Sequence, residues 1–309
     1  MGQAYLDQAK QGKNSWWRYV LGVMLIAFFW LLIGGIVAAA AAIAWLDSQS
    51  TPLEKLLPTT EQALLQVLQS PTLEAYVINN LPFLCFYGGL FAVMCWLHQR
   101  PVKSLLSVDG TFKIARFARG FGLWFLLLGL PSLIDYAFNT ESYQRIPLLT
   151  NWLQFLPFAL VLTPFQVAAE ELLFRGYLLQ GLGLISRNSF FLICVNGGLF
   201  ALPHLANPEL QRGAVWLILI YFAIGAFLAL VTLKENRLEM ALGIHAANNI
   251  LVVVFVNSVD SAVPAPTLLT AQETGDPRLT LLLLLGQMLV FYYLCFGRRR
   301  GKPVSGSKQ

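Results

Sequence analysis

The sequence predicts an all-α fold, a polytopic transmembrane bundle of about eight helices. Of its 309 residues, 57% are hydrophobic and only 12% are charged, and the mean hydropathy is +0.62. Both the composition and the hydropathy lie outside the range of soluble globular proteins. Apolar runs of about 20 residues, long enough to cross the hydrocarbon core of a bilayer, cover nearly the whole chain. No stretch remains for a separate water-soluble core, so we expect one membrane domain.

The apolar runs predict the transmembrane helices. They span residues 19–46, 76–97, 117–138, 152–182, 188–205, 214–233, 238–257 and 279–296. The first run follows basic residues, as the apolar part of a secretory signal does. A cleavable signal, however, has an apolar stretch of roughly 7 to 15 residues. The longer run found here is therefore expected to stay in the bilayer as a signal anchor.

Basic residues flank the apolar region at both ends: Lys10, Lys13, Arg18, Arg298, Arg299, Arg300 and Lys302. Loop 98–119 is also basic, whereas loop 47–74 is mainly acidic. Since cytoplasmic loops of membrane proteins are enriched in Lys and Arg, the pattern predicts both termini in the cytoplasm. We expect a cytoplasmic segment at 1–18, a single transmembrane domain at 19–297 and a basic cytoplasmic tail at 298–309. The expected location is the plasma membrane of a bacterium, as an integral multi-pass protein.

Several partners and cofactors are not indicated. The isoelectric point is near 9.1, but the basic residues lie beside helix ends rather than on one face, so no nucleic-acid partner is expected. The four cysteines lie in apolar runs without motif spacing, which indicates neither disulfides nor a thiolate metal site. The composition implies the lipid bilayer as a partner and leaves the oligomeric state open. Residues 257–277 are rich in Ser, Ala, Pro and Thr and are expected to form a plain loop.

The first polar cluster in the apolar region is Glu170, Glu171 and Arg175, in the run AAEELLFRGYLL. Ionisable groups are costly within a bilayer, so they usually pair or serve a function there. Glu171 and Arg175 are four residues apart, acid first, and can form an ion pair on one helix face. Adjacent helical positions diverge by about 100°, which leaves Glu170 free to face a cavity. The structural alternative is that both acids form one network with Arg175.

Two further clusters contain histidine. Phe200 and His204, in the run LFALPHLAN, are one helical turn apart. His245 and Asn249, in the run GIHAANNILVVV, are also four residues apart and share a helix face, with Asn248 close to it. The structural alternatives are a histidine at a helix end with satisfied hydrogen bonds, and a His–Asn set that only bridges helices.

The three clusters can meet in one layer of the bundle. At about 1.5 Å per residue, Glu170, Asn249 and His204 lie roughly 16 to 24 Å from the inner ends of their helices. A carboxylate, two imidazoles and an amide around one cavity suit water-mediated peptide hydrolysis. Glu170 can accept a proton from water beside His204, while His245 and Asn249 can donate hydrogen bonds to an oxyanion. The third histidine, His98, lies at a basic helix end, where we expect an exposed structural role.

Other chemistries find less support in these motifs. Glu170, His204 and His245 could together hold a zinc ion as a two-histidine, one-carboxylate site. None of the spacings forms an HExxH helix, however, so the sequence does not favour a metal, and no cofactor is expected. No Ser or Cys lies within the motifs, so a serine or cysteine nucleophile is not indicated.

The three motifs resemble those of a known family. EELLFR at 170–175, FALPH at 200–204 and HAANN at 245–249 are similar to the EExxxR, FxxxH and HxxxN motifs of the CPBP family, with order and spacing intact. That family joins type II CAAX prenyl endopeptidases to bacteriocin-processing and bacteriocin-immunity proteins. The resemblance covers about residues 152–256, the expected family core.

The resemblance implies a role for each motif residue. Glu170 and His204 would activate water, and His245 and Asn249 would form the oxyanion hole. Structural support would come from the remaining motif residues, Glu171, Arg175, Phe200 and Asn248. Our leading hypothesis is an intramembrane endopeptidase that cleaves a membrane-associated peptide or lipoprotein within the bilayer, and the resemblance does not fix its substrate.

Two other functions stay open at this stage. The polar clusters could only brace the bundle of a non-enzymatic immunity or partner-binding protein of the same family. A proton-coupled transporter is a third possibility, because buried acids and histidines also make proton relays. We find no internal repeat of the kind that marks many transporters, which disfavours this third function.

Overall fold

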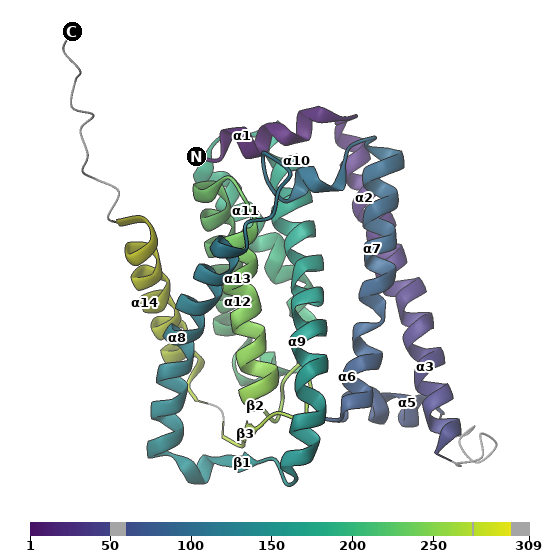
Figure 1. Cartoon of the computed structure of the whole chain (residues 1–309), viewed down its shortest axis with the longest axis vertical. Helices are drawn as coiled ribbons and strands as arrows, with labels where there is room; N and C mark the ends of the chain where they lie inside the picture. The colour runs from purple at the N-terminus through teal and green to yellow at the C-terminus, as the bar shows by residue number, and fades with distance from the viewer. Residues whose placement is uncertain (50–59, 274, 298–309) are drawn as a thin grey trace.

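The computed structural model describes residues 1–49, 60–273 and 275–297, which form a bundle of long helices (Figure 1). The N-terminal half contains α1 (Gln3–Leu6), η1 (Asp7–Gln11), α2 (Trp16–Ala27), η2 (Phe28–Ile33), α3 (Gly34–Ser48), α5 (Thr60–Gln69), α6 (Leu73–Asn80), α7 (Pro82–Ala92), η4 (Val93–Leu97), η5 (Val102–Leu105), α8 (Ile114–Phe138) and η6 (Thr140–Ser142). The C-terminal half contains α9 (Leu149–Glu171), η7 (Leu172–Leu178), α10 (Leu179–Ile185), α11 (Ser189–Ala201), η8 (Leu202–Ala206), η9 (Pro208–Arg212), α12 (Ala214–Glu235), α13 (Glu239–Ile250), η10 (Leu251–Phe255) and α14 (Pro277–Phe296). The strands are β1 (Tyr143–Arg145), β2 (Val256–Ser258) and β3 (Leu269–Ala271).

The expected helical bundle is confirmed. In the described ranges, seven helices are long and apolar enough to cross a membrane: Trp16–Ser48, Leu73–Leu97, Ile114–Phe138, Leu149–Ile185, Ser189–Ala206, Ala214–Glu235 and Pro277–Phe296. The remaining expected helix is the shorter apolar helix Glu239–Phe255, formed by α13 and η10. The chain is therefore a polytopic integral membrane protein. The expected tail at 298–309 lies outside the described residues.

Helix α13 runs through the middle of the C-terminal part and packs against α8, α9 and α12. Its contact with α8 is close because residue 243 is glycine: a Cβ atom there would collide with the backbone of Phe117 and Phe121. Helices α11 and α12 also pack closely, since a Cβ at Gly225 would lie 2.7 Å from the Cβ of Phe200. Because α12 packs against both α11 and α13, the motif at 200–204 lies close to the histidine motif of α13.

A small sheet replaces the plain loop expected at 257–277. β3 pairs antiparallel with β1 and parallel with β2, in the order β1-β3-β2. The sheet lies at the end of the bundle opposite the N-terminus (Figure 1). The expectation of a plain loop was wrong because β3 finds its partners at the end of η10 and in the linker between α8 and α9, which the local composition does not indicate.

His98 is buried, contrary to the exposed position expected from the basic helix end. It is 2% exposed, its Nδ1 lies 2.7 Å from the carbonyl oxygen of Lys13, and its Nε2 lies 2.8 Å from the hydroxyl of Tyr177. The N-terminal segment also packs inward, with Tyr5 and Leu6 fully buried. Residues that precede the first transmembrane helix thus pack against α10 and η5, and Lys13 contacts His98 directly after η4.

Candidate active site

The paired acids of the first motif lie at the last turn of α9, where the π-helical segment η7 begins. Their side chains diverge as adjacent helical positions must. The Glu171 side chain is completely buried, whereas that of Glu170 is 17% exposed and lines a cavity. Single π-helical turns inside α-helices often mark functional sites. The structure therefore separates one interior acid from one acid that solvent or substrate can reach.

Glu171 joins the first motif to the third. Its Oε1 accepts a hydrogen bond of 2.6 Å from Nη1 of Arg175, on the same helix face, as the four-residue spacing predicts. The same oxygen lies 2.8 Å from Nδ1 of His245 on α13. Arg175 also donates to the carbonyl of Gly225 on α12, at 3.2 Å. A buried charge pair of this kind is stable only when hydrogen bonds satisfy both ions, and these bonds tie three helices together.

Phe200 lies between the charged and imidazole groups of all three motifs. The Arg175 guanidinium carbon is 4.3 Å from the centre of its ring. The ring centroids of His204 and His245 lie 4.8 Å and 5.7 Å from that of Phe200. Phe200 is 1% exposed, so it fixes the spacing of these groups by packing and by a cation–π contact.

His204 lines the cavity and has one ring nitrogen engaged with the backbone. Its Nδ1 lies 2.8 Å from the carbonyl oxygen of Phe200, and because a carbonyl only accepts, this nitrogen carries the proton. In the neutral ring, Nε2 is then an acceptor. Tyr221 of α12 stacks on the imidazole at 4.2 Å between centroids, with 29° between the planes. The ring of His204 is thus held both along its edge and on its face.

Tyr221 was not among the candidates from the sequence. Its hydroxyl donates to Glu209, and Asn207 donates to both the Tyr221 hydroxyl and the Glu209 carboxylate at 3.0 Å. Glu209 also accepts from the backbone N–H of Ala262 at 3.1 Å. The sequence contains one feature that could have indicated Tyr221: it is a residue with a polar hydroxyl within the apolar run 214–233. These contacts arise between segments, so spacing along the chain did not indicate them.

Glu170 lies closer to the third motif than to the second. Its Oε2 is 3.8 Å from Nε2 of His245, and its Oε1 accepts a hydrogen bond of 3.3 Å from Gln166, one turn earlier on α9. No hydrogen bond joins Glu170 to His204 in the described ranges; the two side chains share the cavity wall. Gln166 was also missed by the sequence reasoning, although its position one turn before Glu170 could have indicated it.

The two asparagines of the third motif face the same cavity. Asn248 donates from Nδ2 to Oδ1 of Asn249, at 3.1 Å. This bond orients the Asn249 amide and leaves its Nδ2 without a hydrogen-bond acceptor in the part of the chain that the structure describes. Asn249 therefore presents a donor, and Asn248 holds it in place.

The cavity has a volume of about 490 Å³. Its wall includes all four residues expected to be catalytic, together with Gln166, Tyr221 and Asn248. Tyr143 of β1 lies on the same wall, and its hydroxyl donates to Asp135. Burial, followed by the Asp135 carboxylate, raises the pKa of Tyr143 to about 12. The three motifs thus converge on one hollow with several polar groups.

Each histidine that could serve as a zinc ligand has one ring nitrogen already engaged with the protein. Among the described residues, no three His, Cys, Asp or Glu side chains lie close enough together to hold a metal ion. In particular, Nδ1 of His245 faces Glu171 and Nδ1 of His204 faces a carbonyl.

Comparison with known proteins adds two matches. Residues 151–251 match the family model described as type II CAAX prenyl endopeptidase Rce1-like. An uncharacterized protein of Bacillus subtilis (strain 168), YyaK, is 31% identical over 259 residues, which cover 82% of this chain and 84% of the relative. No solved structure matches the chain. The family match contains all three motifs and the helices α9 to α13 that place them.

Proposed function

Because this chain belongs to the Rce1-like family of type II CAAX prenyl endopeptidases, we propose that it is an intramembrane endopeptidase. It hydrolyses a peptide bond of a membrane-bound or lipid-associated substrate with a water molecule activated by Glu170 and His204. The observation that carries the proposal is the convergence of Glu170, His204, His245 and Asn249 on one cavity of about 490 Å³.

Water activation falls to Glu170. Its carboxylate is held by Gln166 at one oxygen, and its side chain is partly exposed to the cavity. The carboxylate accepts a proton from water while the water oxygen attacks the peptide carbonyl carbon. Nε2 of His204, unprotonated when the ring is neutral, accepts a second hydrogen bond from the same water and orients it. The proton then passes from Glu170 to the amine nitrogen as the C–N bond breaks.

The developing oxyanion takes hydrogen bonds from the third motif. Asn249 donates from Nδ2, an amide that Asn248 already orients. His245 donates from Nε2 when its ring is doubly protonated, because its Nδ1–H is directed at Glu171. Donors fixed in advance toward the developing charge are among the largest contributions to catalysis. Glu171, Arg175 and Phe200 support the site by holding His245 and the ring of His204.

A non-enzymatic membrane immunity or partner-binding role is the second candidate. The observation in its favour is that Oε1 of the buried Glu171 is engaged by both Arg175 and His245, as in a structural network between helices. In that case the polar residues of the three motifs only stabilise the packing of the helices. The protein would then capture a partner and release no cleavage product.

The substrate class and membrane location extend the same proposal. A cavity within the bundle, beside apolar helices, suits a peptide carried on or in the bilayer, and prenylated peptides are the first class to test. We also propose the plasma membrane of a bacterium, with both termini in the cytoplasm, from the distribution of Lys and Arg.

The decisive experiment uses the full-length protein in lipid nanodiscs with a panel of fluorogenic lipopeptides, with and without a prenyl group. Glu170→Gln is expected to reduce cleavage by about 10²- to 10⁴-fold, the usual contribution of a general base. Glu74→Gln, an exposed glutamate in the first turn of α6, is the matched control and is expected to keep full activity. Full activity of Glu170→Gln would overturn the assignment. Absence of any product with the wild-type protein, together with capture of an intact partner, would favour the non-enzymatic role.

A further inference from the structure

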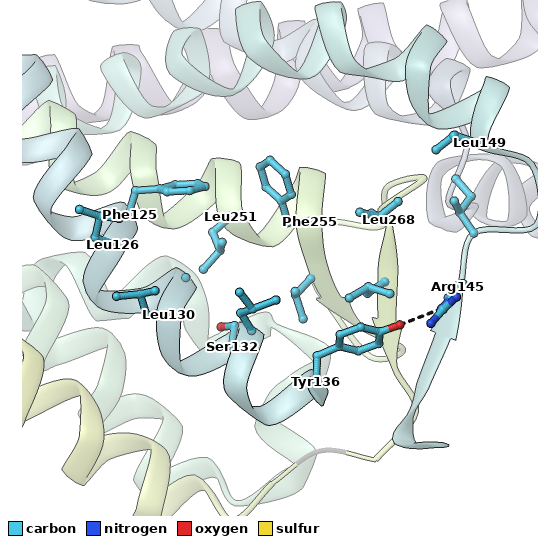
Figure 2. Close-up of a pocket in the computed structure, with 15 residues that line it drawn as sticks. Phe125, Leu126, Leu130, Ser132, Tyr136, Arg145, Leu149, Leu251, Phe255 and Leu268 are labelled. Atoms are coloured by element: carbon cyan, nitrogen blue, oxygen red, sulfur yellow. Dashed lines mark hydrogen bonds between the residues drawn. The ribbon is translucent and has the colours of Figure 1, made fainter. Parts of the chain in front are cut away.

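A second and larger cavity, of about 670 Å³, lies beside the candidate active site. Figure 2 shows its wall: Phe125 and Leu130 extend from α8, Leu251 and Phe255 from η10, and Leu268 from the segment before β3. Nearly all of the lining side chains are apolar. A ligand that fits this cavity must therefore be largely hydrocarbon.

The open side of this cavity faces the surroundings of the bundle. Four of its lining leucines are more than half exposed, namely Leu126 at 55%, Leu130 at 55%, Leu133 at 63% and Leu149 at 57%. They belong to α8 and α9, both of which are apolar and long enough to cross a membrane. A hydrocarbon chain can enter from the bilayer without passing through water. Because lipid tails are as apolar as leucine, burial alone gives little affinity, and a polar anchor is needed for specific binding.

Arg145, at the end of β1, supplies that anchor (Figure 2). Its Nε donates to the Tyr136 hydroxyl at 2.8 Å. In the described residues no carboxylate lies within ion-pair distance of Arg145, and its two terminal nitrogens make no hydrogen bond. Asp135, which precedes Tyr136 on α8, accepts hydrogen bonds from Asn139 and Tyr143. A guanidinium with two free nitrogens matches the paired oxygens of a phosphate.

We propose that this cavity binds one phospholipid molecule of the surrounding bilayer, with an acyl chain between α8, η10 and α9 and the phosphate on Arg145. Charge complementarity favours this occupant over a second copy of the chain, because Arg145 at the rim has no ion-pair partner among the described residues and the rest of the wall is almost entirely apolar. The proposal does not depend on peptidase activity.

The proposed lipid site is close to the candidate catalytic residues. Leu251 and Phe255 belong to η10, which continues the helix that carries His245 and Asn249. Val256 lines both cavities. A bound lipid thus packs against the same helix as the candidate catalytic groups.

Glycines of α8 offer a matched pair of variants for the test. A Cβ at Gly129 would point into the cavity and meet nothing closer than Leu251, at 3.8 Å, so Gly129→Leu fills the space that the acyl chain requires. A Cβ at Gly122, on the same helix, would meet no atom within 4 Å, and Gly122 does not line the cavity. Gly122→Leu therefore controls for the cost of leucine on α8.

The test is native mass spectrometry of the full-length protein, titrated with phosphatidylglycerol or with diacylglycerol of the same chains. Wild type and Gly122→Leu are expected to retain one phosphatidylglycerol, and Gly129→Leu is expected to lose it. Arg145→Gln should weaken phosphatidylglycerol binding by about tenfold, the effect of one charge-assisted contact, and leave diacylglycerol binding unchanged. Folding of each variant is checked by its unfolding midpoint.

Three results would overturn the proposal. Equal retention by Gly129→Leu and wild type would show that the lipid binds elsewhere. Equal affinity for phosphatidylglycerol and diacylglycerol would show that Arg145 does not bind phosphate. Displacement of the phospholipid by a lipidated peptide would assign the cavity to the tail of a substrate.

Discussion

The Nδ1 atom of His245 lies 2.8 Å from the Oε1 atom of Glu171, so the imidazole of one motif is held by the carboxylate of another. Glu170, the next residue along α9, approaches the other nitrogen of the same ring at 3.8 Å. One histidine is therefore flanked by two acids with different surroundings. The two acids should respond differently to the same substitution.

Glu171→Gln is expected to destabilise the protein by about 3 to 5 kcal/mol, because it leaves the buried Arg175 charge without a counter-ion. Glu170→Gln should leave the unfolding midpoint close to that of the wild type, since Glu170 makes no ion pair with Arg175. Thermal unfolding in detergent, followed by tryptophan fluorescence, measures both. Equal loss of stability in the two variants would contradict the division between a structural and a cavity-facing acid.

Tyr221 is expected to position His204. Tyr221→Ala removes the stacked ring and should lower kcat by about tenfold or more with a smaller change in KM, because a misplaced water activator weakens the transition state rather than substrate binding. Tyr221→Phe keeps the ring and loses only the hydroxyl that donates to Glu209, so it should retain much of the activity. If Phe and Ala variants were equally impaired, the hydroxyl rather than the stacking would be the important feature.

Gly243→Ala is expected to lower the unfolding free energy by about 1 to 3 kcal/mol, the usual range for overpacking a close contact. The added methyl group would meet the backbone of Phe117 and Phe121, which cannot move aside as a flexible side chain can. Gly122→Ala on α8 is the control, since its Cβ has open space. The comparison of the two unfolding midpoints tests whether α8 and α13 approach each other as closely as described.

Stability should fall as the pH decreases below about 6.5, because His98 is buried as a neutral ring. Burial lowers the pKa of His98 from its ordinary value of 6.5; the hydrogen bond to the Lys13 carbonyl acts in the opposite direction, and Arg100 and Arg18 again lower it. The unfolded chain therefore takes up this proton at a higher pH than the folded chain does. Its contribution to stability is complete above 6.5 and is lost as the pH falls toward the lowered value.

Unfolding midpoints measured between about pH 8 and pH 5 would show this loss, and the slope cannot exceed about 1.4 kcal/mol per pH unit for one group. His98→Gln should flatten that part of the profile, since glutamine does not titrate. An unchanged slope in His98→Gln would assign the pH dependence to other groups.

The sequence predicted the helices and the convergence of the motifs. These predictions rest on local features, namely the length of the apolar runs and the spacing of residues along one helix. Long apolar runs must be helical in a bilayer, and the spacing of Glu171 and Arg175 places them on one face whatever surrounds them. The motif spacing also predicted that Arg175 would form its ion pair with Glu171 and not with Glu170, as the structure shows. The catalytic roles of Glu170, His204, His245 and Asn249 stay predictions.

What the sequence did not predict depends on contacts between distant segments. The stacking of Tyr221 on His204 joins α12 to η8, and the burial of His98 depends on the chain before the first transmembrane helix folding back over it. The strands are only three residues each, too short to produce an alternating pattern. Their pairing is set by where α8 and η10 end and where α9 begins, which periodicity does not reveal.

The pairing of Tyr143 with Ala271 has a consequence for how the protein is made. These residues lie far apart in the chain, and among the described residues one transmembrane helix, α14, follows β3. The partner of β1 therefore leaves the ribosome when nearly all of the other helices have already entered the bilayer. Tyr143 and Ala271 both line the cavity that the motifs share, so a chain truncated before residue 269 would contain its motif helices and still lack part of the cavity wall.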